Sequence, residues 1–112
     1  MTGAGFEISA SEAVERAGKS GWLLDVREQA EWDLGRAPGA HLIPMSVIEQ
    51  RSAEIPENEQ IVVICQAGYR SLQVARALVA AGYDAVSVAG GMDAWQSAGG
   101  VVVHDGSAST SA

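Results

Sequence analysis

Residues 60–71 read Gln60-Ile-Val-Val-Ile-Cys65-Gln-Ala-Gly-Tyr-Arg70-Ser71, and this stretch decides the fold of the chain. Its first part, Gln60–Ile64, is dominated by β-branched apolar residues, which predicts a strand buried on both faces. Apolar side chains then recur at helical spacing over Arg70–Ala81, which predicts a helix that ends at Gly82. A strand that passes through a short loop into a helix is the repeating unit of α/β folds with a parallel sheet.

The rest of the chain alternates between the same two patterns. Short apolar runs predict further strands at Trp22–Val26, Ala40–Ile43 and Ala85–Val88. Helical spacing, capping-box pairs and glycine stops predict helices at Ile8–Gly18, Glu28–Leu34, Ser46–Arg51 and Met92–Ser97. Strands that alternate with helices indicate an α/β layer structure with a mostly parallel central sheet.

The length of 112 residues fits a single domain, which we expect over residues 1–105. Residues 106–112 contain only Gly, Ser, Thr and Ala, and we expect a disordered tail there. The N-terminal residues lack the features of a signal peptide, and no apolar run is long enough to span a membrane. We therefore expect a cytoplasmic protein without a membrane partner, and its single cysteine fits a reducing compartment.

The charge of the chain argues against nucleic acid as a partner. The 14 acidic and 7 basic residues give a net charge of −7. Nucleic-acid binding depends on neutralising phosphates with lysine and arginine, so this balance excludes that class of partner. The histidine, acidic and cysteine residues also lack metal-ligand spacing, so we expect no metal ion and no other cofactor.

Cys65 follows the predicted strand Gln60–Ile64, at the edge of a parallel sheet where ligands bind. A loop leads from it into the helix at Arg70 and comprises Gln66, Ala67, Gly68 and Tyr69. Such a loop can turn its backbone N–H groups inward, and together with the helix dipole they stabilise an anion. Gly68 allows the tight turn, and Arg70 adds a permanent positive charge. The thiolate of Cys65 should therefore be favoured, which makes this residue the candidate nucleophile.

Asp25 and Arg27 lie at the end of the predicted strand Trp22–Val26, facing the same edge of the sheet. We expect them to form an ion pair or hydrogen-bond network that fixes the neighbouring loops, and a direct catalytic role is the alternative. Neither His41 nor His104 forms a persuasive catalytic pair with Cys65, so no separate general base is expected.

The loop at Cys65 resembles the active-site loop of the rhodanese family of sulfurtransferases, whose pattern is Cys-x-x-Gly-x-Arg-Ser. Three further stretches resemble family signatures in the right order. They are Leu-Leu-Asp-Val-Arg-Glu at 23–28, Glu31-Trp32 with Gly-Arg-Ala-Pro-Gly-Ala-His-Leu-Ile-Pro at 35–44, and Gly90-Gly91 followed by Trp95. The resemblance covers about residues 6–103. Each motif is short, but together in this order they are specific.

This resemblance implies a five-stranded, mostly parallel central sheet flanked by helices on both faces. It implies an enzyme, a rhodanese-type sulfurtransferase, in which Cys65 takes a sulfane sulfur from thiosulfate or a persulfide. The resulting Cys65 persulfide then passes the sulfur to cyanide or a thiol. The substrate-binding residues would be Gln66, Ala67, Gly68, Tyr69, Arg70 and Ser71, and the supporting residues Asp25 and Arg27.

Two alternatives stay open at this point. A non-catalytic rhodanese-like module that binds a partner or senses redox state is compatible with the acidic surface, although the presence of both Cys65 and Arg70 argues against it. A phosphatase or arsenate reductase uses a similar loop, but related phosphatases place one residue more between their Cys and Arg. The loop residues between Cys65 and Arg70 are all neutral, which argues against a strong thiosulfate preference and favours a protein persulfide as an alternative donor.

Overall fold

β4 (Ile61–Ile64) is the middle strand of a five-stranded sheet in the computed structural model, which describes residues 3–104. The other strands are β1 (Glu7–Ile8), β2 (Trp22–Asp25), β3 (His41–Leu42) and β5 (Ala85–Val88). They lie in the order β1-β5-β4-β2-β3, and each neighbouring pair is parallel. The carboxyl ends of the strands therefore lie at the same edge of the sheet.

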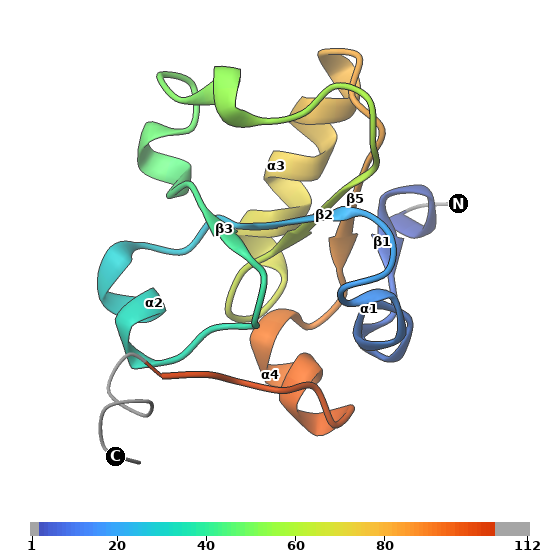
Figure 1. The fold of residues 1–112 in the computed structure, drawn as a ribbon. Helices are drawn as coiled ribbons and strands as arrows, with labels where there is room; N and C mark the ends of the chain where they lie inside the picture. The colour runs from blue at the N-terminus through green and yellow to red at the C-terminus, as the bar shows by residue number, and fades with distance from the viewer. Residues whose placement is uncertain (1–2, 105–112) are drawn as a thin grey trace.

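Helices cover both faces of this sheet (Figure 1). They are α1 (Ala10–Arg16), α2 (Gln29–Leu34), α3 (Tyr69–Ala80) and α4 (Gly91–Ser97), with short 3₁₀ turns at Gly3–Phe6, Met45–Val47 and Ser52–Glu54. α3 packs on one face, whereas α1 and α4 pack together on the other. α2 follows β2 beyond the carboxyl edge of the sheet (Figure 1).

The alternation of side chains along β4 divides the core between these two faces. Ile61 and Val63 belong with Cys65 to the apolar cluster under α3, whereas Val62 and Ile64 belong to the cluster under α1 and α4. Every residue of β4 is buried, which explains why its sequence is an unbroken apolar run. The same alternation turns Cys65 towards α3.

The predicted α/β fold with a five-stranded central sheet is confirmed, and the sheet is parallel throughout. The bounds of β5 are those predicted, and α3 begins at Tyr69, one residue before its predicted start. At the end of α3 the Tyr83 N–H donates to the Leu78 carbonyl at 2.9 Å, and Gly82 has a φ of +99°. These contacts form a Schellman cap, and Gly82 stops the helix as the sequence predicts.

The predicted helix over Ile8–Gly18 is wrong at its start, because Ile8 belongs to β1. Ile8 pairs with Val88 of β5, and its carbonyl accepts the Ala89 N–H at 2.9 Å. α1 begins only after Ser9, whose hydroxyl accepts a hydrogen bond from the backbone of the first turn at 3.1 Å. A strand of two residues is too short to show an apolar run in the sequence.

The predicted helix over Ser46–Arg51 is also wrong, since this segment contains only a 3₁₀ turn at Met45–Val47 and a following turn. The Ser46 hydroxyl donates to the Glu28 carboxylate at 3.1 Å instead of capping a helix. The Ser-x-x-Glu spacing at this position therefore does not mark a capping box, because the serine hydroxyl is used in a tertiary contact. The strand predicted over Ala40–Ile43 is shorter in the structure, where β3 contains only its two middle residues.

No helix within residues 3–104 is long and apolar enough to cross a membrane. In the same part of the chain, no three His, Cys, Asp or Glu side chains form a group that could hold a metal ion. The tail predicted at residues 106–112 lies outside the described residues.

Candidate active site

The loop of residues 65–71, here named the cradle loop, wraps hydrogen-bond donors around the Cys65 sulfur. The Gly68 N–H donates to Sγ at 3.1 Å, and the Ser71 N–H donates to it at 3.3 Å. The Ser71 hydroxyl also lies 3.3 Å from Sγ. The Cys65 side chain is buried, so these contacts are shielded from water. Donors that converge on one atom stabilise negative charge there.

Gly68 gives the cradle loop its tight turn at the start of α3. Its φ of +101° lies in the left-handed region that favours glycine. A Cβ at this position would come 2.9 Å from the backbone nitrogen of Gly90, so the loop packs directly on the turn before α4. The chain therefore needs glycine here for both its conformation and its close contact.

The first residues of α4 hold the backbone of the cradle loop. The Met92 N–H donates to the Cys65 carbonyl at 2.8 Å, and the Asp93 N–H donates to the Gln66 carbonyl at 3.1 Å. Gly91 has a φ of +58°, and a Cβ there would overlap the Cys65 carbonyl oxygen. The sequence contains Gly90-Gly91 as a short signature, but nothing local indicates that this turn supports the Cys65 backbone.

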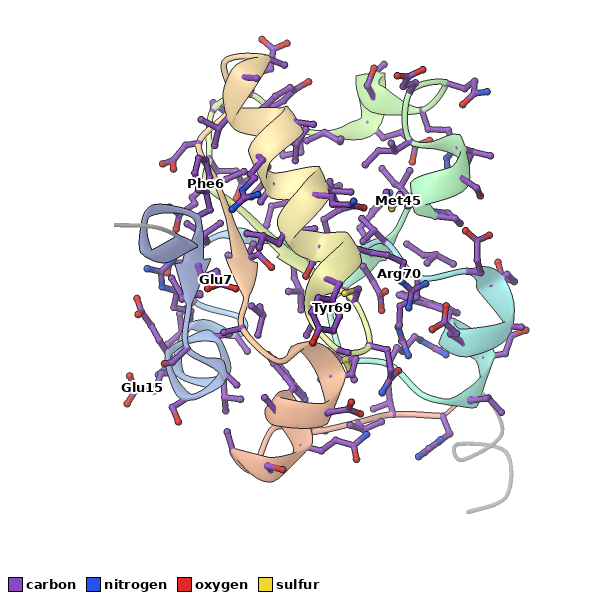
Figure 2. The ribbon with its side chains drawn as sticks, turned by 180° about the vertical axis from the view of Figure 1, so that it is seen from behind. Phe6, Glu7, Glu15, Met45, Tyr69 and Arg70 are labelled. Carbon is purple, nitrogen blue, oxygen red and sulfur yellow. The ribbon has the colours of Figure 1, made fainter. Side chains whose placement is uncertain are left out.

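Arg70 extends from α3 towards α2 (Figure 2), where it forms a bidentate ion pair with Glu31. Both nitrogen-to-oxygen distances are 2.8 Å. The hydrogen bonds from Arg70 lower the pKa of Glu31 to about 2, although partial burial opposes this, and the hydrogen bonds to Glu31 raise the pKa of Arg70. The sequence predicts that the Arg70 guanidinium binds an anionic substrate, and in the structure this guanidinium binds the Glu31 carboxylate. Sequence reasoning gave Glu31 no role, although it lies in a quoted motif.

Asp25 and Arg27 form a buried ion pair at the end of β2, with Arg27 Nη2 donating to an Asp25 carboxylate oxygen at 2.9 Å. The same guanidinium donates to Gln66 Oε1 at 3.1 Å and to the Gly35 carbonyl at 2.8 Å. The Gln66 amide nitrogen in turn donates to the Asp93 carboxylate at 2.8 Å. This network joins the cradle loop to β2, to the end of α2 and to α4.

The outer side of the cradle loop is exposed. Tyr69 is 80% exposed at the start of α3 (Figure 2), and Ala67 is exposed as well. Gln66 is partly buried, whereas Gly68 and Ser71 are buried. The predicted substrate-binding residues thus lie in the cradle loop, with its donors inside and Tyr69 at its rim, whereas Asp25 and Arg27 lie beside it at the end of β2.

A cleft of about 310 Å³ lies beside the cradle loop, and its lining includes Arg27, Gln66 and His104. His41 instead lies at the surface, 3.0 Å from a carboxylate oxygen of Glu54. Within residues 3–104, neither histidine is a hydrogen-bond partner of the Cys65 sulfur. Among the described residues, the hydrogen-bond partners of the sulfur are therefore two backbone amides and one hydroxyl.

The chain resembles known proteins over most of its length. Residues 9–98 match the profile of the rhodanese-like domain family. The chain is 41% identical over 76 residues to the probable adenylyltransferase/sulfurtransferase MoeZ of Mycobacterium tuberculosis, which is 65% of this chain and 19% of MoeZ. It is 36% identical over 92 residues to the putative sulfurtransferase YtwF of Bacillus subtilis, which is 80% of this chain and 89% of YtwF.

A solved structure shares the same fold. The rhodanese-related protein from Thermoplasma volcanium has a TM-score of 0.83 with 31% identity, over 88% of this chain and 97% of that chain. The match to the family profile, residues 9–98, contains the whole cradle loop and the elements that hold it. This chain therefore belongs to the rhodanese-like domain family.

Proposed function

We propose that this protein is a sulfurtransferase that moves a sulfane sulfur from a donor to a thiophilic acceptor through a persulfide on Cys65. The observation that carries the proposal is the convergence of two N–H groups and one hydroxyl on the Cys65 sulfur. Donors placed in this way stabilise negative charge on the sulfur, and the thiolate is the form of cysteine that acts as a nucleophile. The family match and the relatives named sulfurtransferases support the same chemistry.

The proposed reaction has two displacements at sulfur. The Cys65 thiolate attacks the sulfane sulfur of thiosulfate, so a new sulfur–sulfur bond forms while the old one breaks, and sulfite leaves with the bonding electron pair. The thiolate of an acceptor, or cyanide, then attacks the outer sulfur of the persulfide. This second step releases the acceptor persulfide, or thiocyanate, and returns the Cys65 thiolate to the cradle loop.

A persulfide donor fits the charge of the site better than thiosulfate does. The side chains of the cradle loop between Cys65 and Arg70 are neutral, and the charge of Arg70 is balanced by Glu31. A doubly charged anion gains little from such a balanced pair, whereas a persulfide carries less charge. We therefore propose a persulfide on a protein or small thiol as the preferred donor, and a thiol as the preferred acceptor.

The test is transfer of sulfur to the purified protein, followed by mass spectrometry of the intact chain. Wild-type protein is incubated separately with thiosulfate and with a small organic persulfide. We expect the mass of one sulfur atom to be added to the wild type and none to the Cys65→Ala variant. Thermal unfolding of both proteins shows whether the variant keeps its fold.

A second step of the experiment shows whether the sulfur bound to the protein can be transferred to an acceptor. The loaded protein is mixed with a thiol or with cyanide, and the added mass should disappear as the acceptor persulfide or thiocyanate is formed. A folded wild-type protein that gains no sulfur from either donor would contradict the proposal. That result would instead favour a non-catalytic module of the same family.

A further inference from the structure

Ser87 extends the contacts of the Cys65 sulfur into β5. Its Oγ lies 2.7 Å from the Ser71 Oγ, which itself lies 3.3 Å from Cys65 Sγ. Both serines are fully buried. Three polar side chains, from β5, α3 and the end of β4, therefore form one buried row that ends at the sulfur.

A hydroxyl at position 87 is unusual for its surroundings. Ala85 and Ser87 share one face of β5, and Ala85 belongs to the apolar cluster under α3 that also contains Cys65. A buried hydroxyl in such a cluster is unfavourable unless it makes a hydrogen bond. The contact with Ser71 supplies this hydrogen bond to the Ser87 hydroxyl. Ser71 in turn contacts the Cys65 sulfur, so the buried Ser87 hydroxyl is linked to the sulfur through Ser71.

The ionisation state of Cys65 determines how the hydroxyl protons of Ser71 and Ser87 can be used in hydrogen bonds along this row. When Cys65 is ionised, Ser71 donates to the sulfur and Ser87 donates to Ser71, so both protons are used. When Cys65 carries its proton, the row contains three protons for the same two contacts, and either serine can donate to the other. One of the three protons then lacks an acceptor in the row, and within residues 3–104 Ser87 Oγ makes no other hydrogen bond that could take it. A buried donor without an acceptor is costly, so the row favours the ionised sulfur.

We propose that Ser87 is a positioning residue, which holds the Ser71 hydroxyl in the orientation that donates to the ionised Cys65 sulfur. The inference rests on the proposed role of Cys65 as the nucleophile and adds a group on β5 to it. Ser87 does not touch the sulfur itself in the structure; it acts through Ser71.

Charged groups also surround the cradle loop, and they must stay unchanged in a test of Ser87. They come from each element packed around it: Asp25 and Arg27 at the end of β2, Glu31 on α2, Arg70 on α3 and Asp93 on α4. Each of these side chains has a partner other than Ser87. Removal of the Ser87 hydroxyl therefore leaves these charges in place.

The test is the rate at which iodoacetamide alkylates Cys65, measured by mass spectrometry over a range of pH. At mildly acidic pH, Ser87→Ala should slow alkylation by about three- to tenfold, because fewer molecules carry the ionised sulfur. At alkaline pH, where every sulfur is ionised, the rates should converge. Ser87→Thr restores a hydroxyl and should bring the acidic rate back towards that of the wild type.

Two further variants separate positioning from a general structural effect. In a Ser71→Ala background, Ser87→Ala should have no additional effect on the pH profile, because the link to the sulfur is already broken. Ala85→Gly removes a buried group from the same face of β5 and should lower the temperature of unfolding without moving the pH profile. An unchanged profile in folded Ser87→Ala, or an equal change in the Ser71→Ala background, would overturn the inference.

The alkylation test of Ser87 is independent of the sulfur-transfer test of the proposed function. Alkylation reports the ionisation of Cys65 whether or not the protein accepts sulfur. Failure of sulfur loading with a normal Ser87 effect would contradict only the proposed function. Normal loading without a Ser87 effect would contradict only the positioning role.

Discussion

The net charge beside the cradle loop depends on Glu31 as much as on Arg70. The two side chains form a bidentate pair, and each is about one third exposed. Glu31 is held in place a second time, since its carboxylate accepts the Glu28 N–H at 3.0 Å in a capping box at the start of α2. The Glu31 carboxylate thus both caps α2 and balances the charge of Arg70.

Replacement of Glu31 with glutamine should therefore make thiosulfate a better donor. Glutamine can keep the capping hydrogen bond but removes the negative charge that balances Arg70. We expect Glu31→Gln to increase the rate of Cys65 persulfide formation at low thiosulfate concentration by about three- to tenfold. The same change should have little effect with a neutral organic persulfide donor.

Glu54 provides the matched control for this substitution. It also pairs with an arginine, Arg51, at 2.7 Å, but that pair lies on the segment before β4 and not at the cradle loop. Glu54→Gln should leave thiosulfate loading unchanged. A slower reaction in Glu31→Gln would show instead that Glu31 is needed to orient Arg70.

Among the secondary-structure elements, α4 does the most to hold the site without contributing a side chain to the sulfur. Its first N–H groups bind the carbonyls of Cys65 and Gln66, and Gly91 lets the two backbones approach closely. The buried side chains of Met92 and Trp95 fix α4 against the sheet. The position of the cradle loop therefore depends on how α4 packs.

Gly91→Ala should damage both the fold and the site. The new Cβ adds the cost of a left-handed conformation to an overlap with the Cys65 carbonyl, so we expect a loss of more than about 2 kcal/mol in the free energy of unfolding. Urea denaturation measures this loss, and sulfur loading of the protein that remains folded should also fall.

Gly99 offers a control with the same backbone strain but no overlap. Its φ is +89°, and a Cβ there has nothing within 4 Å. Gly99→Ala should therefore cost only about 1 kcal/mol and should leave sulfur loading intact. Equal losses in the two alanine variants would contradict the role given to the close contact of Gly91.

At the scale of the whole molecule, the ion pairs of Glu31 and Glu54 are expected to make the stability of the described part of the chain depend on pH. Glu31 links α2 to α3 through Arg70, and Glu54 binds Arg51 and His41 around β3. Hydrogen bonds from these arginines lower the pKa of both carboxyls from 4.5 to about 2. A carboxyl with a lowered pKa in the folded state contributes stability only while it is ionised.

The contribution of these pairs should be complete above about pH 4.5 and should disappear as the pH falls towards about 2. Glu31 and Glu54 are both partly exposed, so each contribution is small and sensitive to salt. We expect the double variant Glu31→Gln, Glu54→Gln to be less stable than the wild type at neutral pH. The difference in unfolding temperature should vanish near the acid limit, and a difference that stays constant with pH would contradict this account.

Local patterns in the sequence determine much of this protein. The apolar run of β4, the helical spacing of α3 and Gly82 at its end predict these elements because each pattern reflects burial or capping within a few residues. The spacing from Cys65 to Arg70 likewise places a cysteine before a helix start, where backbone donors converge. The fold class and the candidate nucleophile therefore follow from the sequence alone.

Other features exist only because the tertiary structure brings distant residues together. Glu31 and Arg70 are 39 positions apart in the chain, and Ser71 and Ser87 are 16 positions apart. β1 is too short to be stable by itself and forms only as a partner of β5, while Ser46 binds Glu28 in place of capping a helix. These pairings depend on the order of the strands and the packing of helices across them, which no local spacing encodes. The sequence thus determined the candidate nucleophile and its loop, and the tertiary structure decided which carboxylate pairs with Arg70 and which hydroxyl contacts Ser71.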